Sequence, residues 1–396
     1  MFSVLKTADK KPICARTIVK ASVGSVLFLM LVMPVRAETP VDPCQPYSAL
    51  KFKPVVWDGE LVFVMTAPYK TKQLRVWVPI PPSDSMQHVR HSEFVTFPAK
   101  LKPQIGNEPV FGNRFAYFEI KEPIGAMMIR HRLTVLSHEL HWNLDATRIQ
   151  APTSWPESFK PYLRSENQAV VVDARFESLL GEILPQRRNA LLDLEAVLKF
   201  TDRNFTYNHH NSSLKASSVH AIEQKTGHCS DYHGFCAAMG RAMSLPTRVT
   251  YGFNPFPKPS PSHCKLETFL PPYGWVSFDV SETQKLVNAI RAKHSLSNAD
   301  KEALVTAAQK RLIAGFRDNT YILQTRGTDY ELMPPAASKV AVVRTLYAEA
   351  DGVALPDPDP SDRDETTFAW MTIHQFTSDV PAAYPFEDAM SLTVKQ

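Results

Sequence analysis

The chain has 396 residues, of which 44% are hydrophobic and 21% are charged. This composition excludes a disordered chain, and the length allows two or three packed domains. The formal net charge of +4 arises in the first 37 residues, which hold six basic residues and one acidic residue, so the remainder carries a net charge of −1. That near-neutral remainder has no basic face or charge run, which gives no support for nucleic-acid or anionic-membrane binding.

The N-terminus has the features of a secretory signal peptide. Five basic residues between positions 6 and 20 precede an apolar run at residues 21–35. The run is about 15 residues long, shorter than the roughly 20 that span a bilayer, so we expect cleavage after Ala37. We therefore predict a signal peptide at residues 1–37 and an exported protein, either periplasmic or secreted. An uncleaved anchor in the inner membrane is the alternative.

Four cysteines follow the signal peptide, namely Cys44, Cys229, Cys236 and Cys264. They are too few for a disulfide scaffold, and the sequence leaves open whether Cys44 pairs with one of the others. Glycine is scarce, at 14 of 396 residues, yet five glycines lie between Gly227 and Gly274. This concentration predicts tight turns or close backbone contacts in that segment.

Residues 41–150 have the pattern of an antiparallel β-sandwich. Short β-like runs such as "LRVWVPI" and "NRFAYFEI" are separated by Pro, Gly and Asn, and apolar residues alternate with polar ones at residues 129–135. Four prolines in residues 151–186 predict a linker.

Residues 187–296 change to helices followed by strands. Apolar residues recur at helical spacing from residue 191 to residue 198, and a second short helix fits residues 218–227. A third helix is predicted to begin at or beside Cys229 and to end before Pro246. The runs "TRVTYGF", "HCKLETFL" and "GWVSFDV" then predict strands. Residues 297–396 are expected to form an amphipathic helix and a β-rich C-terminal region.

Cys229 is the candidate nucleophile because the start of a helix lowers the pKa of a thiol. A thiolate also needs a base, usually a histidine that is oriented by a carboxylate or an amide. His263 and Asp279 fit these roles, because the tight connection at residues 271–274 predicts a hairpin that brings their strands together. Alternation along a strand puts His263, Lys265 and Glu267 on one face and Cys264 on the other.

These segments resemble the transglutaminase-like cysteine-enzyme superfamily. The family patterns G-x-C-x-D, R-A-x-x-[IL]-P-x-R, H-x-x-x-E and G-W-x-x-x-D correspond to "GHCSD", "RAMSLPTR", "HCKLE" and "GWVSFD" in the same order. The resemblance covers roughly residues 187–285. It implies an α+β fold with a papain-like or transglutaminase-like core, in which a helix bearing the cysteine packs on an antiparallel sheet.

The resemblance also implies the role of each site residue. Cys229 is the expected nucleophile, His263 the general base and then acid, and Asp279 the residue that orients the imidazole. The Cys229 N–H is expected to stabilise an oxyanion, and Tyr207 is a weaker candidate for a second contribution. Neither a metal nor a cofactor is expected. The expected substrate is a peptide or protein, with a cell-envelope component as one option.

Two positions depart from the family pattern. Ser244 replaces the glycine that is usual at the end of the helix, which we expect to cost little. Lys265 replaces the aromatic residue that is usual two positions after the histidine. A cation there disfavours the imidazolium form of His263 unless Glu267 or solvent compensates.

Several functional alternatives remain at this point. The thioester formed on Cys229 is resolved by water in a peptidase or amidase, which is the favoured outcome, and by an amine in a cross-linking transglutaminase. A non-catalytic binding module and a metal site made by Cys229, His263 and Cys264 are further alternatives, although the metal site lacks paired-ligand spacing. The sequence does not indicate the oligomeric state.

Overall fold

The computed structural model describes residues 41–256, 262–356 and 370–393. The predicted signal peptide and its cleavage position lie outside the described residues. Within these three ranges, none of the helices has both the length and the apolar character required to cross a membrane.

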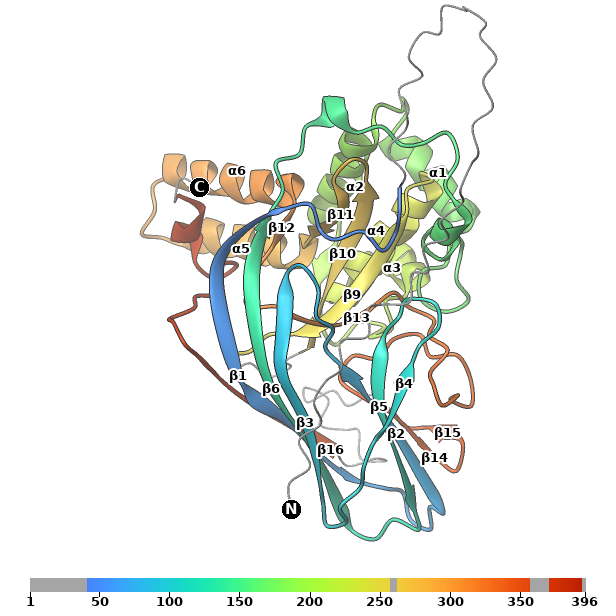
Figure 1. Ribbon diagram of the computed structural model, residues 1–396. Helices are drawn as coiled ribbons and strands as arrows, with labels where there is room; N and C mark the ends of the chain where they lie inside the picture. Colours follow the sequence, from blue (N-terminus) through green and yellow to red (C-terminus); the bar gives the residue numbers. More distant parts are fainter. Residues whose placement is uncertain (1–40, 257–261, 357–369, 394–396) are drawn as a thin grey trace, which may run out of the picture.

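Two five-stranded antiparallel sheets pack face to face as a β-sandwich (Figure 1). The first has the order β12-β6-β1-β16, with β3 also paired to β6, and the second has the order β15-β14-β2-β5-β4. Val55 and Ile129 of the first sheet and Val76 and Phe118 of the second lie in one shared hydrophobic core. The strands of the first sheet are β1 (Leu50–Thr66), β3 (Gln87–Phe97), β6 (Ala126–His141), β12 (Phe316–Arg317) and β16 (Trp370–Ser378); those of the second are β2 (Gln73–Ile80), β4 (Gln104–Asn107), β5 (Arg114–Lys121), β14 (Tyr347–Ala350) and β15 (Val353–Ala354).

The C-terminal strands complete this sandwich instead of forming a separate sheet. β16 pairs along β1 from Trp57–Ser378 to Met65–Trp370, and β14 pairs with β2. The polypeptide therefore leaves the sandwich after β6, forms the helical part and returns to the sandwich. Figure 1 shows β14 and β16 beside strands of the N-terminal half.

The second part of the molecule is a four-stranded antiparallel sheet with the order β11-β10-β9-β13 and several helices packed against it. Its strands are β9 (Thr247–Phe253), β10 (Ser262–Leu270), β11 (Gly274–Phe278) and β13 (Ile322–Arg326), and a two-stranded parallel pair consists of β7 (Thr206–Tyr207) and β8 (Thr226–Gly227). The helices are α1 (Ala174–Ile183), α2 (Ala190–Asn204), α3 (Ser218–Gln224) and α4 (Cys229–Ala242). The mixed α+β fold predicted from the sequence is thus confirmed, and α1 lies within the segment that the prolines had predicted to be a linker.

Helix α4 is the central element of this part, and nearly all of its residues are buried. Two of its glycines explain how its neighbours approach so closely. A Cβ atom at Gly234 would lie 2.2 Å from the carbonyl oxygen of Ala216, and one at Gly240 would lie 2.4 Å from a methyl carbon of Thr247. After the helix, Ser244 adopts a left-handed φ of 61°, the conformation for which glycine is usual.

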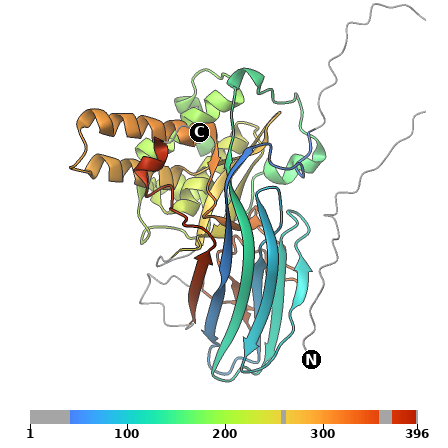
Figure 2. The ribbon, with the colours of Figure 1, turned by 60° about the vertical axis from the view of Figure 1, so that its left-hand side comes forward.

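A helical hairpin follows β11 and extends to one side of the molecule (Figure 2). It consists of α5 (Val280–Ala292) and α6 (Asn298–Ala314), which pack together through Leu286, Ile290 and Leu304. Helix α6 corresponds to the amphipathic helix predicted from residue 297, whereas α5 was not predicted. Short 3-10 helices occupy Ala146–Arg148, Glu157–Tyr162 and Ala389–Leu392.

Candidate active site

Cys229 is the first residue of α4. The preceding residue, His228, caps the helix, because its Nδ1 atom accepts the Ser230 N–H at 3.1 Å. In return, Asp231 accepts the His228 N–H at 3.2 Å, which completes a capping box. No described residue accepts a hydrogen bond from the Cys229 N–H, as is usual for the first N–H groups of a helix.

His263 and Asp279 come from the two strands of the predicted hairpin. The β10–β11 register pairs Leu266 with Phe278, so the next position along the hairpin sets Asp279 beside Lys265 and within reach of His263. The Nε2 atom of His263 lies 2.7 Å from Oδ2 of Asp279. Since Nε2 is occupied by this contact, Nδ1 is the nitrogen that remains for the thiol.

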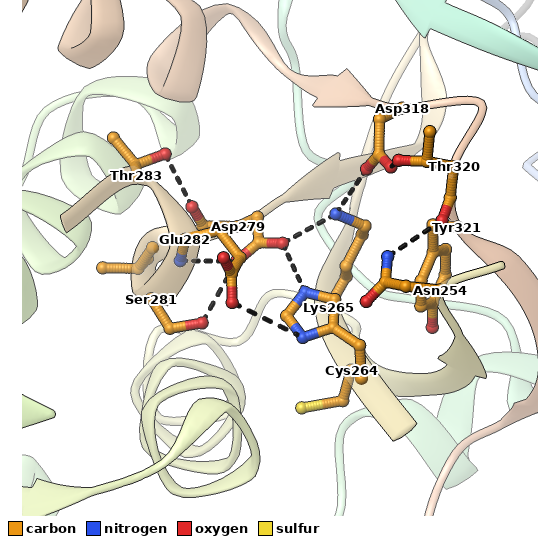
Figure 3. Close-up of polar contacts among 12 residues, drawn as sticks. Asn254, Cys264, Lys265, Asp279, Ser281, Glu282, Thr283, Asp318, Thr320 and Tyr321 are labelled. Atoms are coloured by element: carbon orange, nitrogen blue, oxygen red, sulfur yellow. Dashed lines mark hydrogen bonds and ion pairs between the residues drawn. The ribbon is translucent and has the colours of Figure 1, made fainter. Parts of the chain in front are cut away.

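Asp279 is also the N-cap of α5 and not a residue within β11. Its Oδ1 atom accepts the N–H of Glu282 at 3.1 Å and the hydroxyl of Ser281 at 3.2 Å. The carboxylate is thereby held at a fixed angle, with Oδ2 in contact with His263 and Lys265. Figure 3 shows the contact between Asp279 and Lys265. The orienting group is therefore positioned by a helix start that the sequence analysis had not predicted.

The thiol of Cys229 has a pKa well below its ordinary value. A hydrogen bond from Cys264 lowers the pKa most, burial opposes this effect, and His263 lowers the pKa further. Burial alone would lower the pKa of His263, but the Asp279 carboxylate and the Cys229 sulfur raise it to about 9. These opposite shifts favour a thiolate and an imidazolium at neutral pH.

His228 does not supply the positive charge of that pair, although it is adjacent in sequence. Burial lowers the pKa of His228 to about 4, so the imidazole is neutral at pH 7. Its Nδ1 atom is an acceptor for the helix, which is consistent with the neutral form. Of these two histidines, His263 is therefore the one whose raised pKa favours a cation at neutral pH.

Lys265 lies beside this site, and the way its charge is compensated corrects the prediction. Its Nζ atom is 2.6 Å from Oδ2 of Asp279 and 2.9 Å from Oδ2 of Asp318. Glu267 does not compensate the lysine, because it pairs with Arg248 at 2.7 Å and with Arg317 at 3.3 Å. Asp318, which lies after the predicted catalytic segment, has the role for which Glu267 was one of two candidates.

Tyr207 lies at one side of the thiol. Its pKa is raised, first by burial and then by the charge of Cys229. The Nζ atom of Lys285 lies 3.8 Å from the centre of the Tyr207 ring and 2.8 Å from Oε1 of Glu282. The structure thus brings Tyr207 near Cys229, and it adds Glu282 and Lys285 to the residues around the thiol.

The other buried cysteines differ from Cys229 in their surroundings. Burial raises the pKa of Cys236 to about 12, and Thr201 is its polar neighbour at 3.4 Å. Burial also raises the pKa of Cys264 well above its ordinary value, so this thiol keeps its proton and can donate it in a hydrogen bond to Cys229. Within the described part of the chain, no three His, Cys, Asp or Glu residues are grouped to hold a metal ion.

Four residues of the site were missed by the sequence analysis, namely His233, Glu282, Lys285 and Asp318. Glu282 approaches Nδ1 of His263 at 3.9 Å, and His233 lies 3.6 Å from Oδ1 of Asp279. Asp318 lies beyond the segment that carries the motifs, so their spacing gave no signal for it. A cavity of about 300 Å³ lies elsewhere, beside Met243 and Ser244 at the other end of α4.

Residues 179–280 match the model of the transglutaminase-like superfamily, and this range includes Cys229, His263 and Asp279. The crystal structure of a candidate cysteine protease from Cytophaga hutchinsonii has a TM-score of 0.58 to this chain at 12% identity, covering 85% of this chain and 94% of that one. The periplasmic domain of TgpA from Pseudomonas aeruginosa aligns over 62% of this chain and 86% of that one, at 14% identity and a TM-score of 0.30. No curated protein matches the sequence. The Cytophaga structure shows that the same fold extends over most of both chains.

Proposed function

We propose that the protein is a thiol-dependent enzyme that hydrolyses amide or peptide bonds, because residues 179–280 match the transglutaminase-like superfamily. Cys229 is the nucleophile, His263 is the general base and acid, and Asp279 orients the imidazole. The observation that carries the proposal is the 2.7 Å contact between His263 and Asp279 beside a thiol of lowered pKa at the start of α4.

In the first step, the Cys229 thiolate attacks the carbonyl carbon of the substrate. The developing oxyanion accepts the Cys229 N–H, and Tyr207 is the candidate for a second donor. The imidazolium of His263 then gives its Nδ1 proton to the departing amine, and a thioester remains on Cys229. Asp279 keeps the ring in the orientation that this proton transfer needs.

In the second step, neutral His263 takes a proton from water, and the resulting hydroxide attacks the thioester. The Cys229 thiolate leaves and the carboxylic acid product is released. Water is the favoured acceptor because the Cys229 residue is only 8% exposed, and water reaches such a thiol with less rearrangement than the lysine side chain of a protein. Transfer to an amine shares the first step and would give cross-linking instead.

The substrate that fits this chemistry is a peptide or a protein. The predicted signal peptide favours action after export, on a component of the cell envelope or of the surrounding medium.

Alkylation of the purified protein by iodoacetamide tests the activated thiol. A Cys44→Ser background removes the exposed cysteine, and peptide mapping by mass spectrometry follows Cys229. At pH 6, Cys229 should react at least about tenfold faster than glutathione, whose thiol is of the ordinary kind. His263→Ala should abolish this advantage. A rate equal to that of glutathione, unchanged by the His263 substitution, would refute the role of Cys229 as an activated nucleophile.

A peptide library incubated with and without an amine donor tests the reaction. Cleaved peptides support hydrolysis, whereas amine adducts would replace the peptidase with a transglutaminase. If both incubations give no cleaved peptide and no amine adduct, and Cys229 is not activated, the non-catalytic binding module is favoured.

A further inference from the structure

Lys265 is a buried cation in direct contact with the group that orients His263. The side chain is fully buried, and its ammonium lies between the carboxylates of Asp279 and Asp318 (Figure 3). The rings of Tyr321 and Phe386 each lie 5.0 Å from Nζ. The Lys265 ammonium therefore ends inside the protein, in contact with Asp279 and Asp318, and does not reach solvent.

Asp318 is the second carboxylate beside Lys265. It is fully buried, and one of its oxygens accepts the hydroxyl of Thr320 while the other meets Lys265. Asp318 and Phe386 both lie beyond residues 179–280, the range that matches the family. The C-terminal part of the chain therefore supplies two neighbours of Lys265, the residue in contact with Asp279.

The charges along this line alternate from Asp318 through Lys265 and Asp279 to His263. Without Asp318, two cations would share the single carboxylate of Asp279, and their repulsion would disfavour the imidazolium. With Asp318 present, the four charges sum to zero. Lys265 can then add a second hydrogen bond to Asp279 without opposing the charge on His263.

We propose that Lys265 and Asp318 form a positioning pair, which holds the Asp279 carboxylate against His263 and makes the C-terminal region part of the active site. The inference rests on the proposed function. Neither residue touches the reacting atoms, so both act through Asp279. The alternative is a purely structural ion pair, which would stabilise the fold and leave the thiol unaffected.

Other titratable groups surround the pair, and none of them is substituted in the test. They come from α4, α5, α6, β10 and the C-terminal segments, and they are His233, Glu282, Arg311, His263, Tyr321 and Tyr384. The variants and the parent protein thus share the same six titratable neighbours, so their pH profiles for Cys229 can be compared directly.

The experiment uses two variants in the Cys44→Ser background. One carries Asp318→Asn alone, and the other carries both Lys265→Met and Asp318→Asn. Iodoacetamide alkylation of Cys229 is measured from pH 5 to 10, and thermal unfolding by circular dichroism reports the fold. The double variant removes a balanced charge pair, so we expect it to fold. The acid limb of its alkylation profile should move up by about one pH unit, which lowers the rate on that limb about tenfold.

Asp318→Asn alone should also lower the rate at pH 6, because it leaves Lys265 uncompensated beside His263. This single variant keeps the proposal testable if the double variant does not fold. Glu166→Gln is the matched control: Glu166 pairs with buried Arg241 at 2.8 Å, towards the other end of α4. That variant should lose stability with no change in the pH profile.

The outcomes separate the two proposals. If wild-type Cys229 reacts no faster than glutathione at pH 6, the proposed function fails and the pair has no reaction to support. If the wild type reacts fast and the folded variants keep its rate and pH profile, the pair is structural only and the inference is overturned.

Discussion

The Nδ1 atom of His233 lies 3.5 Å from the sulfur of Cys264, which links α4 to the face of β10 that packs against it. On the other side of the ring, Nε2 accepts the N–H of Val280 at 3.3 Å. Burial lowers the pKa of His233 to about 4, so the ring is neutral and Nε2 can act as an acceptor. One imidazole thus joins α4, β10 and the first residue of α5, immediately after Asp279.

Replacement of His233 by Phe should therefore destabilise the protein. The ring volume is retained, but the buried Val280 N–H loses its acceptor, which costs about 1–3 kcal/mol. Urea unfolding at pH 7 measures this loss. Phe235→Leu, a nearby apolar change on the same helix, separates a packing defect from the lost hydrogen bond. Equal stability of His233→Phe and the wild type would show that the bond to Val280 contributes nothing.

Asp279→Asn should separate the cap of α5 from the charge that orients His263. Asparagine caps a helix as well as aspartate, so α5 should stay folded. The amide cannot stabilise the imidazolium, and we expect peptide hydrolysis to fall about 10²- to 10⁴-fold. Steady-state kinetics measures the fall, and Ser281→Ala, which alters only a minor contact of Asp279, is the control. Activity within about threefold of the wild type would exclude Asp279 as the orienting residue.

The pH dependence of hydrolysis should have an alkaline limb near pH 9. The pKa of His263 is raised to about 9, so the proton that the departing amine needs is present at neutral pH and lost above that value. The acid limb lies well below the pKa of an ordinary thiol, because the pKa of Cys229 is lowered. A profile of kcat/KM against pH tests both limbs. A rate that continues to rise beyond pH 9 would contradict the assignment of His263 as general acid.

The local part of the site was predictable from the sequence, because its signals are short. The start of α4, the β10–β11 hairpin and the glycine-rich segment depend on neighbouring residues. Gly274, for example, has the left-handed φ of 72° that the tight turn requires. At Gly252, a Cβ atom would lie 2.2 Å from the carbonyl oxygen of Ile322, which is the close backbone approach that was expected.

The remaining parts of the site depend on pairings between distant segments, which alternation and spacing do not encode. Asp318 reaches Lys265 only because β12 and β13 bring the loop between them behind Asp279. Likewise, β16 adds to β1 across most of the chain, so its place in the sandwich could not be read from residues 41–150. The charge of Lys265 was also expected to disfavour the imidazolium of His263, because its second carboxylate partner, Asp318, was not known from the sequence.

Glu267 joins three segments of the chain in a buried network. Its carboxylate accepts the hydroxyl of Tyr47 at 2.7 Å and pairs with Arg248 and Arg317. Glu267→Gln should cost about 3–5 kcal/mol at pH 7, since two buried guanidinium groups lose their counter-charge.

The cost of Glu267→Gln should also depend on pH. Burial alone would raise the pKa of Glu267, but Arg248 and Arg317 outweigh it and hold the pKa below its ordinary value. Stability from this carboxylate is therefore present above the unfolded pKa of about 4.3 and is lost as the pH falls through the folded pKa. Urea unfolding from pH 7 to pH 3 should show the two proteins converging, whereas Glu157→Gln, at an exposed pair with Lys160, should match the wild type throughout. A difference that stays constant with pH would mean that the charge of Glu267 does not stabilise the fold.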